Sequence, residues 1–363
     1  MKILHIITSL YTGGAEKLMV DLLPRMKGVG HDVELCVFCG DRTPFYEQLE
    51  EYGIKIHSFY AGMKHLYNPL NIYKLYWLIH TNQYDIVHTH NTAPQLFAAL
   101  VSVLCKTTLV TTEHNTTNRR RDKVYLKPFD NWMYGRYSQI ICISDQAEEN
   151  YLQYLGDGKN ERVCTIYNGI DYNRYSSAKP ADDVRSIGSI IITNVAAFRP
   201  QKDQPTLIKA MQDLPDKYHL CLVGGGDDQR KELLETIITE LGLCDRVHLL
   251  GLRSDVPEVL AASDYVVMCS HYEGLSLSSL EGMASGKPFL ADNVDGLCEI
   301  VEGNGVLFEH EDAKGFANTV MKLDCDKVYR EQVIKQCQTK ASNYDISVMV
   351  KKYLNVYEGI LAK

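Results

Sequence analysis

The segment DYVVMCSHYEGLSLSSLEGMAS, residues 264–285, decides the fold that the sequence predicts. Its first seven residues form the apolar run of a buried strand, and its last ten are typical of a helix that begins near Ser276. Glu273 and Glu281 stand eight positions apart, one in the loop and one two turns into the expected helix. Because a helix N-terminus attracts anions, both carboxylates and the helix start could serve one polyhydroxy, anionic ligand. The structural alternative is that Glu273 stabilises the helix dipole and Glu281 is a solvated helix residue.

The same alternation of strand and helix runs along the whole chain. Apolar, β-branched runs separated by helical segments are typical of parallel sheets, and their order here predicts an α/β fold of two doubly wound, Rossmann-like domains. In such sheets ligands bind beyond the carboxyl ends of the strands, so we expect the two domains to face each other across a cleft. The expected strands are residues 2–8, 32–38, 54–59, 85–90, 107–113, 139–144, 162–167, 189–198, 218–224, 245–251, 264–270, 287–292 and 305–309.

One stretch interrupts the alternation. Residues 168–188 are rich in Asn, Gly, Ser, Pro and charged residues, and we interpret them as the connection between the domains. We therefore expect an N-terminal domain over residues 1–175 and a C-terminal domain over residues 176–345. A last helix, residues 346–363, is expected to pack back on the first domain.

Composition narrows the class of protein. The chain has 363 residues, which is long enough for two domains with separate cores. Among its 11 cysteines one CxxC spacing occurs, Cys36–Cys39, and it lies in an apolar, strand-like run. The sequence shows no membrane-spanning apolar run, and we expect no secretory leader, reduced thiols and a cytoplasmic protein. The net charge is -8, and the acidic excess lies after residue 185. This balance argues against a nucleic-acid partner.

Two glycine pairs follow expected strands. Gly13 and Gly14 follow the first strand, and Gly224 and Gly225 follow the run 218–224. Glycine lets the backbone approach a ligand closely, and the helix start beyond each pair favours an anion. The dinucleotide fingerprint GxGxxG is absent from both, which argues against an oxidoreductase. Tight turns are the structural alternative.

Cations and an imidazole also stand at expected strand ends. Arg199 and Lys202, three residues apart, can hold a diphosphate, Arg through its planar fork and Lys as a point charge. His114 can donate to or accept from a sugar hydroxyl. A solvated pair at the start of a surface helix and a structural histidine are the alternatives.

A metal site has little support. His88, His90 and His114 end neighbouring strands, but the sequence holds no HExxH, and its CxxC, Cys36–Cys39, stands far from them in sequence. Residues 324–326 spell the DxD of metal-dependent sugar transferases, but they do not follow a strand, so we interpret the match as chance. We expect no cofactor and no divalent metal.

Two stretches of the first domain mix aromatic and basic residues. They are residues 64–80 and residues 119–132. We interpret Leu, Ile and Trp of the first as core residues, and contact with an anionic membrane is the alternative for both stretches.

The motifs along the chain occur in the same order as in a known protein family. The chain resembles the retaining glycosyltransferases of family 4, which have the two-domain GT-B fold, over nearly its whole length. The matching motifs are GGAE (13–16), His114, ISD (143–145), YNGID (167–171), FRPQK (198–202), LVGGG (222–226), EGLSLSSLE (273–281) and GMASGKP (282–288).

The resemblance implies a role for each matched residue. Arg199 and Lys202 would bind the donor diphosphate and stabilise the leaving group, Glu273 would lie near the donor sugar, and His114 would contact that sugar. The implied donor-binding residues are Gly13, Gly14, Gly224, Gly225, Ser276, Leu277 and Glu281, of which Glu281 would bind the ribose hydroxyls. Asp295 stands where the family usually has glycine, and Gly282 where it usually has alanine, so donor identity is not carried over with the fold.

The predicted function is transfer of a hexose or N-acetylhexosamine from a nucleoside-diphosphate sugar to a saccharide hydroxyl, with retention. We favour a UDP-sugar, with GDP-mannose as the alternative. A lipid-linked acceptor at the inner face of the cell membrane, in surface polysaccharide synthesis, is the expected partner. The competing functions are a nucleotide-sugar epimerase or hydrolase of the same fold and a non-catalytic nucleotide-sugar-binding module.

Overall fold

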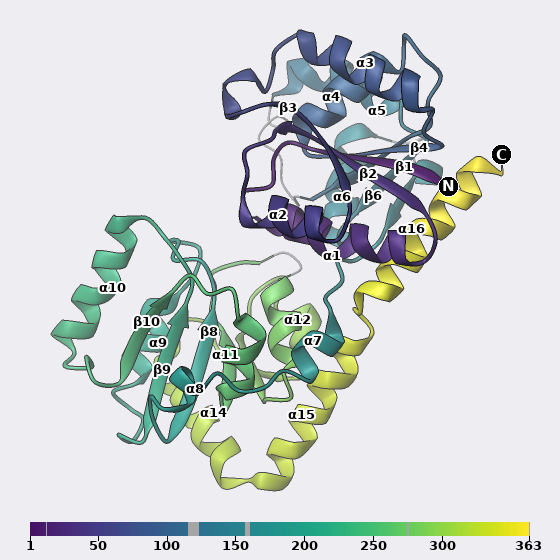
Figure 1. The fold of residues 1–363 in the computed structure, drawn as a ribbon. Helices are drawn as coiled ribbons and strands as arrows, with labels where there is room; N and C mark the ends of the chain where they lie inside the picture. The colour runs from purple at the N-terminus through teal and green to yellow at the C-terminus, as the bar shows by residue number, and fades with distance from the viewer. Residues whose placement is uncertain (12, 115–122, 157–159, 274–275, 363) are drawn as a thin grey trace. The chain divides into compact units, whose positions relative to one another are not determined.

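The computed structural model describes residues 1–11, 13–114, 123–156, 160–273 and 276–362. The chain forms two compact units, one of Met1–Gly169 with Ile346–Lys363 and one of Ile170–Asp345 (Figure 1). The division falls between Gly169 and Ile170 instead of after residue 175, because Ile170 and Tyr175 are buried in the core of the second unit.

The first unit is built on a parallel sheet of seven strands in the order β3-β2-β1-β4-β5-β6-β7. Its strands are β1 (Lys2–Ile7), β2 (Asp32–Cys39), β3 (Lys55–Tyr60), β4 (Ile86–His90), β5 (Leu109–Glu113), β6 (Gln139–Cys142) and β7 (Val163–Thr165). Its α-helices are α1 (Gly14–Gly28), α2 (Pro44–Glu51), α3 (Leu70–Asn82), α4 (Thr92–Val101), α5 (Lys127–Gly135), α6 (Asp145–Leu155) and α16 (Ile346–Leu361). Short 3-10 turns are η1 (Met63–His65), η2 (Val124–Leu126) and η3 (Asn160–Arg162).

Both faces of this sheet are covered. Ile3 and Ile7 of β1 pack with α1, α2 and α16, whereas Leu4 and Ile6 pack in the cluster that includes α3, α4, α5 and α6. A strand buried on both faces needs apolar residues at successive positions, which explains the continuous run KILHII.

The second unit has a parallel sheet of six strands in the order β10-β9-β8-β11-β12-β13. Its strands are β8 (Ile190–Val195), β9 (Tyr218–Val223), β10 (Val247–Gly251), β11 (Tyr265–Met268), β12 (Phe289–Asp292) and β13 (Val306–Phe308). Its helices are α7 (Tyr172–Ser176), α8 (Asp182–Arg185), α9 (Gln204–Ala210), α10 (Asp228–Glu240), α11 (Val256–Ala262), α12 (Leu277–Ala284), α13 (Cys298–Val301), α14 (Ala313–Cys325) and α15 (Lys327–Ser342). Both sheets and their covering helices confirm the predicted fold class of two Rossmann-like α/β domains.

The expectation that residues 168–188 form a plain connection is wrong. Asp171 caps α7 by accepting a hydrogen bond from the Arg174 backbone N–H at 3.2 Å, and the Val184 side chain of α8 is fully buried. The polar residues that made this stretch look like a linker are the cap and the solvent side of two short helices.

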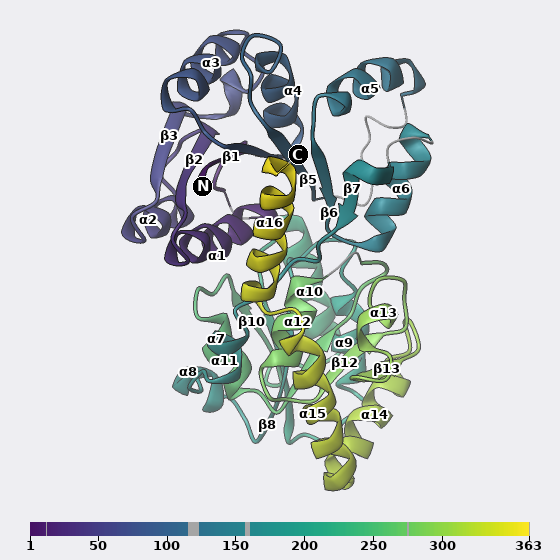
Figure 2. The same ribbon diagram turned by 90° about the vertical axis from the view of Figure 1, so that its right-hand side faces the viewer.

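The last helix belongs to the first unit. A break between Ser342 and Ile346 separates α15 from α16, and α16 then packs against α1 (Figure 2). Tyr353 and Tyr357 of α16 are fully buried.

The aromatic stretch 64–80 is only partly a core element. Leu75 and Ile79 of α3 are buried, as expected, but Leu70 is 58% exposed and Trp77 is 48% exposed. Trp77 lies on the outer face of an amphipathic helix whose inner face already fills the core. In the part of the chain that the structure describes, no helix has both the length and the apolar character that crossing a bilayer requires. Residues 119–122 of the second stretch lie outside the described residues.

Candidate functional site

At the carboxyl ends of the second sheet, a lysine and a glutamate form an ion pair. Lys202 follows β8 and Glu273 follows β11, and the Lys202 Nζ atom contacts the Glu273 Oε1 atom. The Ser270 hydroxyl donates to the same oxygen at 2.8 Å. The side chains of Lys202 and Glu273 are 15% and 10% exposed, so both charges lie in a largely desolvated place at the sheet edge. The structure thus brings together two of the predicted site residues.

The helix that follows this pair begins at the same edge. Ser276 is the N-cap of α12, and its hydroxyl accepts a hydrogen bond from the Ser279 backbone N–H at 3.2 Å. Leu277 is the first helical residue, and the N–H groups of a first turn have no acceptor inside the helix, so they can receive an anion. Glu281 lies in the second turn and is 5% exposed. Gly274 and Leu275 of this motif lie outside the described residues.

Two further polar groups at this edge were missed by the sequence analysis. Within the described part of the chain, the Ser279 Oγ atom is buried without a hydrogen-bond partner. Asp292, at the end of β12, is fully buried and accepts from the Ser270 backbone N–H at 2.7 Å and from the Cys269 thiol at 3.3 Å. Burial raises the pKa of Asp292 to about 6. The signal for Asp292 was its place as the last residue of KPFLAD, a strand end like those of the other candidates.

Arg199 stands apart from the ion pair. The two predicted cations share one tight turn, in which the Lys202 backbone N–H donates to the Arg199 carbonyl at 2.9 Å. The Arg199 side chain is exposed, and the described residues place no carboxylate in an ion pair with it. The pair of cations therefore divides into one held by a carboxylate and one open to solvent.

The glycines after β9 have a structural reason. A Cβ atom at Gly224 would stand 2.0 Å from the Ala196 carbonyl oxygen, and one at Gly226 would stand 2.5 Å from that of Phe198. A Cβ at Gly225 would meet the Leu252 side chain at 2.9 Å. These glycines let the loop after β9 pass close to the loop after β8, and the donor-binding role of Gly224 and Gly225 stays a prediction.

In the first unit, the glycine pair stands at the start of α1. Gly13 is its N-cap, and a Cβ there would meet the Glu16 carboxylate. Gly14 differs, since a Cβ at that position would meet no described atom within 4 Å apart from its chain neighbours and the backbone of its own helix. The donor-binding role of Gly13 and Gly14 stays a prediction.

Four histidines gather at the carboxyl edge of the first sheet. His5 comes from β1, His88 and His90 from β4, and His114 follows β5. His90 forms hydrogen bonds with His5 at 3.0 Å and with His114 at 2.8 Å. Burial lowers the pKa of His114 to about 4 and that of His5 to about 3, so these rings are neutral at pH 7. His5 was missed by the sequence analysis because it sits inside an apolar strand.

The same rings have the spacing of a metal site. Ring nitrogens of His5, His88 and His90 lie within 4.8 Å of one another. However, the Nδ1 of His5 and both nitrogens of His88 and of His90 already take part in hydrogen bonds with protein groups. A metal ion could bind this group only by breaking that set of bonds.

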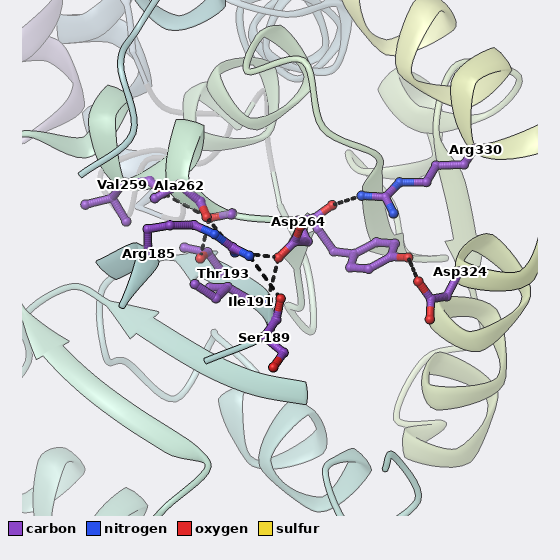
Figure 3. A network of polar contacts seen from close by, with 11 residues as sticks. Arg185, Ser189, Ile191, Thr193, Val259, Ala262, Asp264, Asp324 and Arg330 are labelled. Atoms are coloured by element: carbon purple, nitrogen blue, oxygen red, sulfur yellow. Dashed lines mark hydrogen bonds and ion pairs between the residues drawn. The ribbon is translucent and has the colours of Figure 1, made fainter. Parts of the chain in front are cut away.

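The opposite, amino edge of the second sheet holds a different polar network. The Asp264 carboxylate accepts from Arg185 and from the Ile191 backbone N–H, each at 2.9 Å, and Arg330 donates to the Asp264 carbonyl at 3.1 Å (Figure 3). Asp324, from the DxD string, accepts at 2.8 Å from the hydroxyl of Tyr218, the first residue of β9. Asp324 thus ties α14 to the sheet far from the strand ends where ligands bind, which supports the interpretation of the DxD match as chance.

Comparison with known families accounts for nearly the whole chain. Residues 12–174 match the model described as Glycosyltransferase Family 4, and residues 180–340 match the model described as Glycosyl transferases group 1. The chain belongs to this family of glycosyltransferases, which act on nucleotide sugars.

Relatives of known activity extend over the full length. The chain is 26% identical to the UDP-Gal:alpha-D-GlcNAc-diphosphoundecaprenol alpha-1,3-galactosyltransferase of Escherichia coli, with 98% of this chain and 96% of that protein covered. It is 22% identical to the phosphatidyl-myo-inositol mannosyltransferase of Mycolicibacterium smegmatis, with 96% and 90% covered. Among solved structures, the Anabaena protein HepE in complex with UDP-glucose superimposes with a TM-score of 0.83 at 25% identity, covering 99% of this chain and 100% of HepE.

Proposed function

We propose that the protein transfers a hexose from a UDP-hexose to a hydroxyl of a lipid-diphosphate-linked saccharide, with retention at the anomeric carbon. The observation that carries the proposal is Lys202, a desolvated cation held by Glu273 beside the N-terminus of α12. Supporting it, the Escherichia coli relative uses UDP-galactose and an undecaprenol-linked acceptor, and HepE was solved with UDP-glucose.

In the proposed reaction, the donor diphosphate takes the place of Glu273 as the partner of Lys202. The first-turn N–H groups of α12 and the exposed guanidinium of Arg199 share the remaining negative charge. Glu273, released from the lysine, accepts hydrogen bonds from donor-sugar hydroxyls, and Glu281 binds the ribose. His114 and Gly14, at the carboxyl edge of the first sheet, are the residues that the family resemblance assigns to the same donor.

The bond changes follow from where the positive charge lies. The bond between the anomeric carbon and the phosphate oxygen breaks, and the charge that develops on UDP is stabilised by Lys202 and α12. The acceptor oxygen attacks the same face of the sugar, and its proton passes to the departing phosphate oxygen. These steps need no divalent metal, because Lys202, Arg199 and the helix start supply the positive charge that a metal supplies elsewhere.

The assay that tests the proposal uses a UDP-hexose with an undecaprenyl-diphosphate-linked N-acetylglucosamine as acceptor. We expect transfer in the presence of EDTA, with an α-configured product from an α-configured donor by proton NMR. Consumption of the donor at the same rate without acceptor would instead indicate a hydrolase or epimerase, and binding of UDP without turnover would indicate a non-catalytic module. Preferential use of GDP-mannose would contradict the donor assignment.

We also propose peripheral contact with the membrane that carries the acceptor. On α3, Tyr73 and Trp77 are 64% and 48% exposed, and on α5, Phe129 and Trp132 are 42% and 39% exposed. Both helices belong to the first unit and pack against α4. Exposed Tyr and Trp are the side chains that anchor proteins at a membrane interface.

Flotation with vesicles tests the membrane contact. The protein should float with vesicles that contain anionic lipid, and the double variant Tyr73→Ser/Trp77→Ser should float several-fold less because it loses exposed aromatic area. The exposed Leu233→Ser in the second unit is the control, and we expect it to float like the wild type. Equal flotation of all three proteins would contradict the assignment of α3.

A further inference from the structure

Three imidazoles of the first unit form a continuous chain of hydrogen bonds. The Nδ1 of His5 lies 3.0 Å from the Nε2 of His90, and the Nδ1 of His90 lies 2.8 Å from the Nε2 of His114. His5 and His90 are fully buried. The ring of His90 therefore uses both nitrogens to connect a buried histidine with the one at the strand end.

The rings carry no net charge. Burial lowers the pKa of His5, His90 and His114 below the usual range, and in the case of His90 the neighbouring rings lower it further. A neutral imidazole has one N–H and one lone pair, so each hydrogen bond of the chain takes its proton from one of the two rings it joins. Once one ring is fixed, the tautomers of the other two follow.

The buried end of the chain sets its direction. The Nε2 of His5 is buried and has no hydrogen-bond partner among the residues that the structure describes. A buried N–H without an acceptor is rarer in proteins than an acceptor without a donor, so this nitrogen should be the one without the proton. His5 then donates from Nδ1 to His90, and His90 donates from Nδ1 to His114. The Nε2 of His114 accepts, and its proton lies on Nδ1.

His88 lies beside the three hydrogen-bonded rings and outside their chain of hydrogen bonds. Its Nδ1 lies 2.5 Å from the Tyr357 hydroxyl of α16, and its Nε2 lies 2.8 Å from the Thr112 hydroxyl. Its ring stacks on that of His90 at a centroid distance of 4.4 Å and lies 5.0 Å from that of His5. His88 is thus a buried histidine in the same strand as His90. It forms no hydrogen bond of the series that fixes which nitrogen of His114 carries the proton.

We propose that His5 and His90 are positioning residues that hold His114 in one neutral tautomer, with its Nδ1–H available as a hydrogen-bond donor to an oxygen of the donor sugar. The contact with the sugar rests on the proposed function, whereas the tautomer chain does not. The consequence is that His114 meets its ligand as a fixed donor and not as a ring that exchanges between two forms.

The tautomers can be measured without a substrate. Two-bond proton–nitrogen correlation spectra of the full-length, ligand-free protein with 15N-labelled histidine should show the Nδ1–H form for His5, His90 and His114 at neutral pH. Single histidine variants assign the signals. Mixed tautomers among the three rings, the Nε2–H form, or an imidazolium would overturn the proposal.

Variants at position 90 test whether His90 determines the tautomer of His114. His90→Gln keeps one donor and one acceptor between the neighbours and should preserve the Nδ1–H signal of His114, whereas His90→Leu should abolish it. His88→Gln, in the same strand and equally buried, is the matched control and should leave the signal unchanged. Loss of the signal in His88→Gln, or its persistence in His90→Leu, would overturn the role of His90.

Kinetic measurements test the contact between His114 and the sugar separately from the hydrogen bonds among the three histidines. We expect kcat/KM for the UDP-hexose to fall about tenfold in His90→Leu, the size of one hydrogen bond to a ligand, while the affinity for UDP, which lacks the sugar, stays unchanged. His90→Gln should restore most of kcat/KM. An unchanged kcat/KM in His90→Leu despite a lost Nδ1–H signal would overturn the sugar contact and leave the tautomer chain standing. Failure of all sugar transfer by the wild type would overturn the proposed function. The spectra would still decide whether His5 and His90 fix the tautomer of His114.

Discussion

Two lysine–carboxylate pairs lie at opposite edges of the second sheet. At the amino edge, the Lys217 Nζ atom lies 2.8 Å from Asp324 Oδ2, and the two side chains are 49% and 23% exposed. At the carboxyl edge, Lys202 pairs with Glu273, and the side chains are 15% and 10% exposed. The pairs share their chemistry and differ in how far water screens them.

The surroundings of the pairs differ in the same direction. Of the described polar atoms of Arg185, Asp264 and Asp324 at the amino edge, none is buried without a partner. At the carboxyl edge, Asn194 Oδ1, Asp203 Oδ2 and Ser279 Oγ all are. Buried unpaired polar atoms cost folding free energy, so the presence of several of them at one edge is in keeping with the binding site proposed there. The network at the amino edge consists of paired groups, and we propose the carboxyl edge as the place where the ligand binds.

The largest effect is expected from Lys202→Met. It removes the proposed stabiliser of the leaving diphosphate, and sugar transfer should fall about 10²- to 10³-fold, as for the loss of one oxyanion-stabilising donor. Lys217→Met is the matched control, because it removes the lysine of the other pair, and kcat/KM should stay within about twofold of the wild type. Initial rates at equal concentrations of folded protein measure both variants. Equal losses would mean that the two edges do not differ in function.

The converse effect is expected from Asp264→Ala. This change removes hydrogen bonds from Arg185 and from the Ile191 backbone, and it should cost about 3 kcal/mol of the free energy of unfolding. Thermal unfolding should show a fall of about 6 to 12 °C for a unit of this size. Activity per folded molecule below that transition should be unchanged. A stable but inactive Asp264→Ala protein would contradict the proposal that the amino edge serves stability and the carboxyl edge serves activity.

Asp292 makes the carboxyl edge sensitive to pH. Its pKa in the folded protein is about 6, above the ordinary value of 3.8, because the carboxyl is buried. The folded state therefore holds this proton more tightly than the unfolded state, so the stability it contributes is complete below pH 4 and is lost as the pH rises through 6. The amide of Asp292→Asn cannot ionise and can still accept from Ser270, so the variant should be about 2 kcal/mol more stable than the wild type at pH 8.

Urea unfolding at pH 4.5 and pH 8 measures this difference. The advantage of Asp292→Asn should shrink at the lower pH, where the wild-type carboxyl is protonated. A constant difference at both pH values would show that ionisation of Asp292 is not the cause.

Gly14→Ala extends the comparison to the first sheet. The new methyl group meets no other side chain or neighbouring element of the described residues within 4 Å, so the free energy of unfolding should be unchanged or raised by up to about 1 kcal/mol. If the donor diphosphate occupies that space, kcat/KM should fall about tenfold through overpacking. Gly28→Ala, at the other end of α1 and also in open space, should gain the same stability without loss of kcat/KM. Two equally active variants would exclude Gly14 from the donor site.

The elements that the sequence predicted correctly are those with a local sequence signal. The strands were predictable because a strand buried on both faces needs a continuous apolar run, as in YVVM of β11. The start of α12 was predictable because Ser276 is a cap residue in front of a helical run. The short helices α7 and α8 were not, because their burial comes from Tyr175 and Val184 packing on residues far away in sequence.

The parts of the candidate site that consist of charged residues at strand ends were predictable from the sequence. The parts that depend on contacts between distant segments were not. Lys202 and Glu273 were found by position, but their ion pair joins two loops that only the sheet order brings together. His5 looks like a core residue of an apolar strand, and only the parallel register with β4 sets it beside His90. The exposure of Trp77 depends likewise on which face of α3 meets the core.

We propose that the carboxyl edge of the second sheet binds the diphosphate of the donor through Lys202. Calorimetric titration of UDP into the wild type, Lys202→Met and Lys217→Met tests it directly. We predict equal dissociation constants for the wild type and Lys217→Met and a dissociation constant at least about tenfold higher for Lys202→Met, since a charge-assisted contact with the diphosphate is lost. Equal affinity of Lys202→Met and the wild type would contradict the claim.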